Sequence, residues 1–176
     1  MNYSLLDLLR AGGYILYTRH GEATIGEDQP YIDFMNCLTQ RNLSETGYRQ
    51  AVYYGNILHN LRIPISIPVE ASPFCRAIET AQLAFGRSNV QINPFWYQIY
   101  RLSGDISATE QRRILDSFQS RLAVIPPQGF NKVIIAHSFP EGVGLGKIPD
   151  MGIVIIKPKG RKKVMKLLLD YLTQIY

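Results

Sequence analysis

Short apolar runs alternate along the chain with longer segments in which apolar residues recur every three or four positions. Apolar runs of this length, bounded by polar residues, glycine or proline, are typical of buried strands. They predict five strands, which cover residues 14–18, 68–71, 89–93, 132–136 and 152–156. The first strand continues directly into Arg19-His20-Gly21-Glu22, and the fourth ends at His137.

Helical periodicity follows three polar start signals. Ser44 has the position of an N-cap, Ser72-Pro73 combines a cap with a proline at the first helical position, and Ser107 to Glu110 has capping-box spacing. A leucine cluster before Gly12-Gly13 predicts a further short helix. The apolar face of the first helix is predicted at Tyr48, Ala51, Val52, Gly55 and Leu58, and the buried face of the second at Ala77, Ala81, Ala84 and Phe85. Ile114, Leu115, Phe118, Leu122 and Ile125 continue the third helix as far as Pro126. In the first helix, Ala51 and Gly55 are small enough for a close approach to a sheet.

Strands that alternate with helices predict an α/β fold. We expect a three-layer sandwich with a mainly parallel sheet flanked by helices, in a single domain over residues 1–176. Two connections, Ile25 to Arg41 and Pro94 to Asp105, are predicted to be irregular, and long loops of this kind are often functional. After a turn at residues 158–160, Lys162 to Lys166 are expected to form an antiparallel edge strand, or the start of a longer helix from Arg161. A final short helix is expected to include Leu168, Tyr171, Leu172 and Ile175.

Composition narrows the class of protein. Hydrophobic residues make up 46% and charged residues 19%, which is ordinary for a globular chain. Residues 1–10 include Asp7 and lack an apolar run long enough for a secretory signal or a membrane span, so we expect no membrane association. Nothing in the sequence pairs Cys37 with Cys75, and Cys75 lies within a helical pattern, so a reducing compartment and a cytoplasmic location are expected.

The net charge of +5 comes from one segment near the end of the chain. Basic and acidic side chains balance over residues 1–156, whereas six basic residues stand between 157 and 166. Such a segment can attract nucleic acid or an anionic substrate. No aromatic residues interleave it for base stacking, so we interpret it as a solvated turn and expect no nucleic-acid partner.

Four side chains suited to phosphate chemistry follow predicted strands. Arg19 and His20 follow the first strand, Arg76 lies early in the helix after the second, and His137 follows the fourth. Because parallel α/β sheets bind ligands beyond the carboxyl ends of their strands, we expect these side chains to converge. Arginine forks can hold phosphoryl oxygens while an imidazole nitrogen attacks in line.

A metal site built on the two histidines is the competing interpretation. Zinc sites typically use three or four protein ligands, and no third ligand has a convincing spacing in the sequence. The nearby arginines would also repel a cation. The pattern therefore favours a phosphoryl group, with no metal or organic cofactor.

In this order and spacing, the motifs resemble those of the histidine phosphatase superfamily, which includes the phosphoglycerate mutase-like enzymes. Arg19-His20-Gly21-Glu22 matches its signature, and residues 43–47 match its Leu-Ser-x-x-Gly helix start. Residues 72–81, with Arg76, match its second arginine motif, and His137 matches its second histidine. The resemblance covers most of the chain. It implies that His20 is the phosphorylated nucleophile and that Arg19, Arg76 and His137 complete the phosphate pocket.

Other positions carry weaker implications. Gln40-Arg41, just before the Leu-Ser motif, resembles bacterial members and implies that Arg41 reaches the pocket rim. Ser138 stands where members often have glycine, so it either donates an extra hydrogen bond or narrows the site. A general acid is not evident: Asp105 and Glu141 are the two weak candidates, and Glu110 is more simply a capping residue.

Three functional hypotheses follow. The first is a metal-independent phosphatase that hydrolyses a small phosphomonoester through a phosphohistidine at His20. The second is a protein phosphohistidine phosphatase, since imidazole leaves with less help from an acid than an alkoxide does. The third is a non-catalytic phosphate- or anion-binding module that uses the basic segment. A mutase is less favoured, because no further basic cluster is placed to hold a second phosphate.

Overall fold

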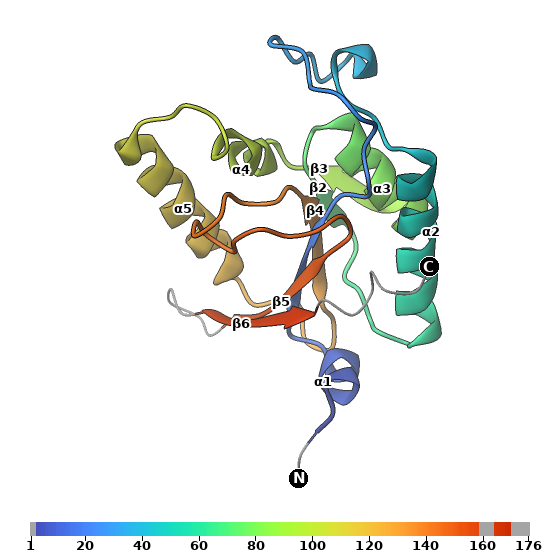
Figure 1. Cartoon of the computed structure of the whole chain (residues 1–176). Helices are drawn as coiled ribbons and strands as arrows, with labels where there is room; N and C mark the ends of the chain where they lie inside the picture. The colour runs from blue at the N-terminus through green and yellow to red at the C-terminus, as the bar shows by residue number, and fades with distance from the viewer. Residues whose placement is uncertain (1–2, 159–163, 170–176) are drawn as a thin grey trace.

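In a computed structural model of the chain, residues 3–158 and 164–169 are described. Their centre is a six-stranded sheet with the strand order β3-β2-β4-β1-β5-β6 (Figure 1). Strands β1, β2, β3 and β4 are mutually parallel, β5 is antiparallel to β1, and β6 at the edge is antiparallel to β5. The strands are β1 Ile15–Arg19, β2 Val69–Ala71, β3 Val90–Ile92, β4 Lys132–Ala136, β5 Ile153–Pro158 and β6 Val164–Leu169.

Helices cover both faces of this sheet (Figure 1). On one face, α1, α2 and α3 pack on alternate strand residues such as Leu16 and Ile135. On the other, α4 and α5 pack on the intervening residues, among them Tyr17 and Ile134. The helices are α1 Leu5–Ala11, α2 Glu45–Asn60, α3 Cys75–Phe85, α4 Tyr97–Arg101 and α5 Ala108–Leu122, with short 3-10 turns η1 Cys37–Thr39, η2 Arg87–Asn89 and η3 Pro94–Trp96. The predicted α/β three-layer sandwich is confirmed.

The C-terminal part of the described chain matches the sequence expectation in part. β6, Val164–Leu169, forms the antiparallel edge strand that was expected near residues 162–166. Leu168, which was predicted to be helical, lies in this strand. The other residues of the predicted final helix, and Lys162 with Lys163, lie outside the described residues.

Two expectations about the first long helix are wrong. Tyr48 is 49% exposed, because the buried stripe of α2 runs through Gly47, Ala51, Tyr54 and Leu58 instead. Gly55 lies against Ala84 of α3, so this glycine allows two helices to approach each other rather than a helix and a sheet. The connection from 94 to 105 is likewise more regular than predicted, since it contains η3 and α4.

The two cysteines form a disulfide, which corrects the expectation of unpaired cysteines. Cys37 in the connection after β1 is bonded to Cys75, the first residue of α3, across 38 positions of sequence. The sequence argument for a reducing compartment therefore no longer holds. Among the described residues, no helix combines the length and apolarity needed to cross a membrane.

This disulfide is expected to stabilise the fold by closing a long loop. For a separation of 38 residues, the loss of chain entropy in the unfolded state corresponds to about 3–4 kcal/mol. Replacing both cysteines with serine should therefore lower the melting temperature by roughly 10 °C, as measured by calorimetry. Dithiothreitol should shift the wild type similarly and leave the double variant unchanged. Equal melting temperatures for the oxidised wild type and the double variant would contradict a stabilising disulfide between Cys37 and Cys75.

Candidate active site

Two neighbouring parallel strands deliver the two histidines. Arg19, the last residue of β1, pairs with Ala136, the last residue of β4. His20 and His137 therefore leave the sheet side by side, and the centroids of their rings lie 5.3 Å apart. Both side chains are buried, with 3% of each residue exposed. The sequence prediction that these residues converge at one edge of the sheet agrees with this arrangement.

The hydrogen bonds of His20 define which nitrogen carries a proton. Its Nδ1 lies 2.7 Å from the carbonyl oxygen of Gly21, so this nitrogen donates and carries hydrogen. Its Nε2 accepts a hydrogen bond of 3.1 Å from Nε of Arg76 and therefore holds a lone pair. Burial, assisted by the Arg76 charge, lowers the pKa of His20 to about 3. The ring is thus neutral near pH 7, with a nucleophilic nitrogen facing an arginine.

Close backbone packing holds the turn that carries His20. A Cβ atom on Gly21 would lie 2.7 Å from the carbonyl oxygen of Gly47. The Arg-His-Gly-Glu motif and the Leu-Ser-x-x-Gly motif therefore both need glycine where their backbones touch. The amide of Gly21 also donates to Oγ1 of Thr80, which in turn donates to the carbonyl of Arg76. The close approach of Gly21 explains why a glycine ends the Leu-Ser-x-x-Gly motif. The hydrogen bonds of Thr80 explain why a threonine follows Arg76 by one helical turn.

His137 is held by polar contacts from β1 and from the residue that follows β2. Its Nε2 lies 2.8 Å from Oγ of Ser72, and its carbonyl accepts a 2.8 Å bond from the hydroxyl of Tyr17. Burial, followed by the neighbouring His20, lowers the pKa of His137 well below its ordinary value. Ser72 was predicted to cap α3, but that helix begins at Cys75 and has no side-chain cap. Its hydroxyl is directed to the site instead.

Arg76 is the most heavily bonded side chain of the site and is 1% exposed. Besides His20, its guanidinium donates two hydrogen bonds to the carboxylate of Asp28, at 2.8 Å and 3.0 Å. A further bond of 3.1 Å reaches the carbonyl of Arg41. The hydroxyl of Tyr100, on α4, donates to the same Asp28 carboxylate at 3.0 Å.

The remaining predicted pocket residues have more peripheral positions. Arg19 pairs with Asp150 at 2.9 Å and also donates to the carbonyl of Ile148. Arg41 is partly buried, and its charge helps to depress the pKa of His20. The hydroxyl of Ser138 accepts the amide of Ile148 at 2.8 Å and donates to the carbonyl of Phe139, so its hydrogen bonds lie within the loop after β4.

Neither candidate for the general acid reaches this cluster. Asp105 and Glu141 are both exposed, and neither hydrogen-bonds or pairs with His20, Arg76 or His137. Within residues 3–158 and 164–169, no group of three or more His, Cys, Asp or Glu side chains is placed to hold a metal ion. Two carboxylates that the sequence reasoning did not single out pair with the predicted arginines, Asp28 with Arg76 and Asp150 with Arg19.

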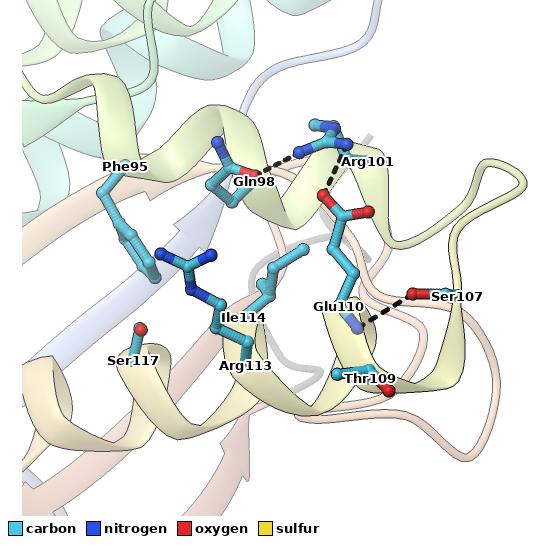
Figure 2. Close-up of a pocket in the computed structure, with 9 residues that line it drawn as sticks. All are labelled: Phe95, Gln98, Arg101, Ser107, Thr109, Glu110, Arg113, Ile114 and Ser117. Atoms are coloured by element: carbon cyan, nitrogen blue, oxygen red, sulfur yellow. Dashed lines mark hydrogen bonds and ion pairs between the residues drawn. The ribbon is translucent and has the colours of Figure 1, made fainter.

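A separate surface pocket lies between α4 and α5 (Figure 2). An ion pair of 2.7 Å between Arg101 and Glu110 bridges the two helices there. Glu110 therefore completes only half of the predicted capping box: its amide binds Ser107, while its side chain binds Arg101. The pair fixes α4, which carries Tyr100 toward Asp28. The pocket is lined by Phe95, Gln98, Arg101, Ser107, Thr109, Glu110, Arg113, Ile114 and Ser117.

Comparison of sequences gives a short match. No protein-family model matches the chain. An alignment over 78 positions, which covers 41% of this chain, shows 38% identity to agropine synthesis reductase from Rhizobium rhizogenes. The segment spans 17% of that protein, so it carries no conclusion about the activity of the chain.

Comparison of structures gives matches over nearly the whole chain. The alpha-ribazole phosphatase from Shigella flexneri matches 90% of this chain and 96% of its own, with a TM-score of 0.61 and 16% identity. A phosphoserine phosphatase mutant from Entamoeba histolytica, in complex with phosphoserine, matches 91% and 98%, with a TM-score of 0.58 and 14% identity. The protein histidine phosphatase SixA, complexed with tungstate, matches 88% and 94%, with a TM-score of 0.54 and 16% identity. These proteins are members of the histidine phosphatase superfamily, and the chain has their fold.

Proposed function

We propose that this protein is a phosphatase of the histidine phosphatase superfamily, which hydrolyses a phosphomonoester through a phosphohistidine on His20. The observation that carries the proposal is the state of the His20 ring. Its Nε2 is unprotonated, faces the Arg76 guanidinium and belongs to a ring fixed through Nδ1. A neutral imidazole held in this way is prepared to attack phosphorus, and the fold shared with known phosphatases supports the same chemistry.

The reaction would proceed in two displacements. In the first, Nε2 of His20 forms a bond to phosphorus while the bond to the leaving oxygen breaks, and Arg76, Arg19 and His137 bind the other phosphoryl oxygens. In the second, water attacks the phosphohistidine, the N–P bond breaks, and inorganic phosphate leaves with a neutral His20 restored. Positioning and positive charge supply most of the catalysis in such transfers.

The position of the carboxylates supports a second candidate, a protein phosphohistidine phosphatase. Asp105 and Glu141 are both exposed, and no hydrogen bond or ion pair joins either of them to His20, Arg76 or His137. Such proton donation is typically worth about 10²–10⁴-fold for an alkyl phosphate. Imidazole, with a pKa of about 6.5, leaves more readily, so a site without a committed acid suits a phosphohistidine substrate.

Hydrolysis of p-nitrophenyl phosphate in the presence of EDTA tests the shared mechanism, because this leaving group needs no acid. Turnover without metal is expected, and its absence in the folded protein would contradict a phosphatase. Asp105→Asn and Glu141→Gln should leave kcat on this substrate unchanged. The two variants should also hydrolyse a phosphohistidine peptide as fast as the wild type, whereas a loss there would assign an acid role to the residue replaced.

A further inference from the structure

The guanidinium of Arg76 is held at its outer end by a carboxylate of the same chain. Asp28, in the connection between β1 and α2, accepts from Nη1 at 2.8 Å and from Nη2 at 3.0 Å. The two side chains are buried, with 1% and 4% of their surfaces exposed. Burial raises the pKa of the Asp28 carboxyl, but hydrogen bonds from Arg76 and Arg41 outweigh it, so the pKa lies below its ordinary value and the group is charged.

The other donors of Arg76 show which edge of the guanidinium is left for a ligand. A guanidinium has five N–H groups in one plane. Two of them meet Asp28, the second N–H of Nη1 donates to the carbonyl of Arg41, and Nε–H donates to Nε2 of His20. The fifth, on Nη2, lies on the same edge as Nε–H and has no acceptor among the described residues. The edge formed by Nε and Nη2 is therefore the one that faces the nucleophile.

This edge becomes a phosphoryl-binding fork at the moment of attack. When Nε2 of His20 bonds to phosphorus, its lone pair is used in the new bond and the Nε–H of Arg76 is released. This N–H and its neighbour on Nη2 are then two parallel donors for phosphoryl oxygens. Asp28 keeps its own two hydrogen bonds throughout, because they lie on the other edge of the guanidinium.

We infer that Asp28 is a positioning residue for the transfer, which fixes the guanidinium of Arg76 so that its Nε and Nη2 edge faces a phosphoryl group in line with His20. The inference deepens the proposed function and rests on it, since it concerns the same pocket. Long side chains such as arginine have several rotatable bonds, and their heads need partners to hold one orientation. The bond from Arg76 to His20 is lost during attack, so Asp28 supplies most of the contacts that remain.

Asp28 is itself held firmly enough to orient another side chain. The amide of Arg41 and the hydroxyl of Tyr100 donate to its two carboxylate oxygens, at 2.8 Å and 3.0 Å. The disulfide between Cys37 and Cys75 joins the same connection to the first residue of α3. The carboxylate is therefore fixed both by its own hydrogen bonds and by the segment that carries it.

Kinetics of Asp28→Asn on p-nitrophenyl phosphate separate positioning from binding. Asparagine keeps the shape of the side chain but offers Arg76 one acceptor in place of two. We expect kcat to fall by about 10–10²-fold, because the fork is no longer aligned. KM should not rise, because the pocket keeps the charge of Arg76 and loses a negative one. Asp33→Asn is the matched control: its side chain, in the same connection, accepts the amide of Met35, and it should keep wild-type kcat and KM.

Orthovanadate tests the same alignment without requiring turnover. It can bind an imidazole nitrogen in a five-coordinate geometry like that of phosphoryl transfer, whereas inorganic phosphate stays tetrahedral. In Asp28→Asn, vanadate should bind at least about tenfold more weakly than in the wild type, and phosphate should bind within about threefold of it, because only the transition-state geometry depends on the fork. Calorimetric titration measures both constants, and Asp33→Asn again serves as the control.

A second variant keeps the test decisive if Asp28→Asn does not fold, which thermal melts establish. Tyr100→Phe removes one hydrogen bond from Asp28 and keeps the aromatic ring. It should lower kcat and weaken vanadate binding by a smaller factor, about threefold, with phosphate binding unchanged.

The outcomes separate this inference from the phosphatase proposal. Unchanged kcat and vanadate binding in folded Asp28→Asn, or in Tyr100→Phe if Asp28→Asn does not fold, would overturn the inference while wild-type turnover stands. Equal weakening of phosphate and vanadate would also overturn it, because Asp28 would then support the pocket as a whole. Selective weakening of vanadate in a protein without turnover would uphold the positioning role and overturn the phosphatase. A wild type that neither turns over nor binds vanadate would overturn both.

Discussion

Replacing His20 with alanine is expected to reduce kcat on p-nitrophenyl phosphate by at least about 10³-fold, since loss of a covalent nucleophile removes the whole reaction path. The ring is the group whose Nε2 lone pair faces Arg76, and its neutral state follows from burial. No other described side chain at the site has both features, because Nε2 of His137 is engaged by Ser72. Initial-rate kinetics with EDTA present measure the effect.

His59→Ala is the matched control for that substitution. His59 is the remaining one of the chain's three histidines, and it is exposed in the last turn of α2. The control should keep wild-type kcat and KM. Equal turnover by His20→Ala and the wild type would exclude His20 as the nucleophile, and equal losses in both variants would indicate unfolding rather than chemistry.

Replacing Arg76 with lysine should lower kcat/KM by about 10²–10³-fold, the cost typical of removing one preorganised donor from a developing anion. Lysine keeps a positive charge near the buried Asp28, so the fold is not left with an unpaired carboxylate. It loses the planar fork and the Nε donor to His20. The main loss is therefore expected in kcat, because the missing contacts align the phosphoryl group with the nucleophile.

Arg113→Lys provides the comparison for Arg76→Lys. Arg113 is exposed and lines the pocket between α4 and α5 (Figure 2), so its replacement should change neither kcat nor KM. A loss of less than threefold in Arg76→Lys would show that charge alone suffices at this position. The bidentate geometry would then carry no part of the catalysis.

Local signals were sufficient for much of the architecture. β4 has the bounds expected from its apolar run, 132–136, and Ser107 caps α5 as expected. The convergence of His20, Arg76 and His137 followed from one rule, that parallel strands present their carboxyl ends at the same edge. These features depend on residues close in sequence or on the chain direction, which a periodic pattern can reveal.

Features that depend on how a long loop folds back were missed. Asp28 stands in the connection from 25 to 41, but nothing in the sequence distinguishes it from Glu27 or Asp33 before Arg76 is placed beside it. The Cys37–Cys75 bond depends on the same folding of the loop. Ser72 was assigned to the wrong partner for a related reason: a helix-capping signal in the sequence does not show that His137 lies closer.

Trapping the phosphoenzyme tests the central claim most directly. The protein is mixed with p-nitrophenyl phosphate, quenched in alkali, in which phosphohistidine survives, and its peptides are examined by mass spectrometry and phosphorus NMR. We predict one phosphoryl group on His20, attached at Nε2 because Nδ1 carries the proton bound to Gly21. The phosphoryl group should be absent from His20→Ala and present in His59→Ala. Rapid turnover with no phosphoryl group on His20, or with the group on another residue, would contradict the account.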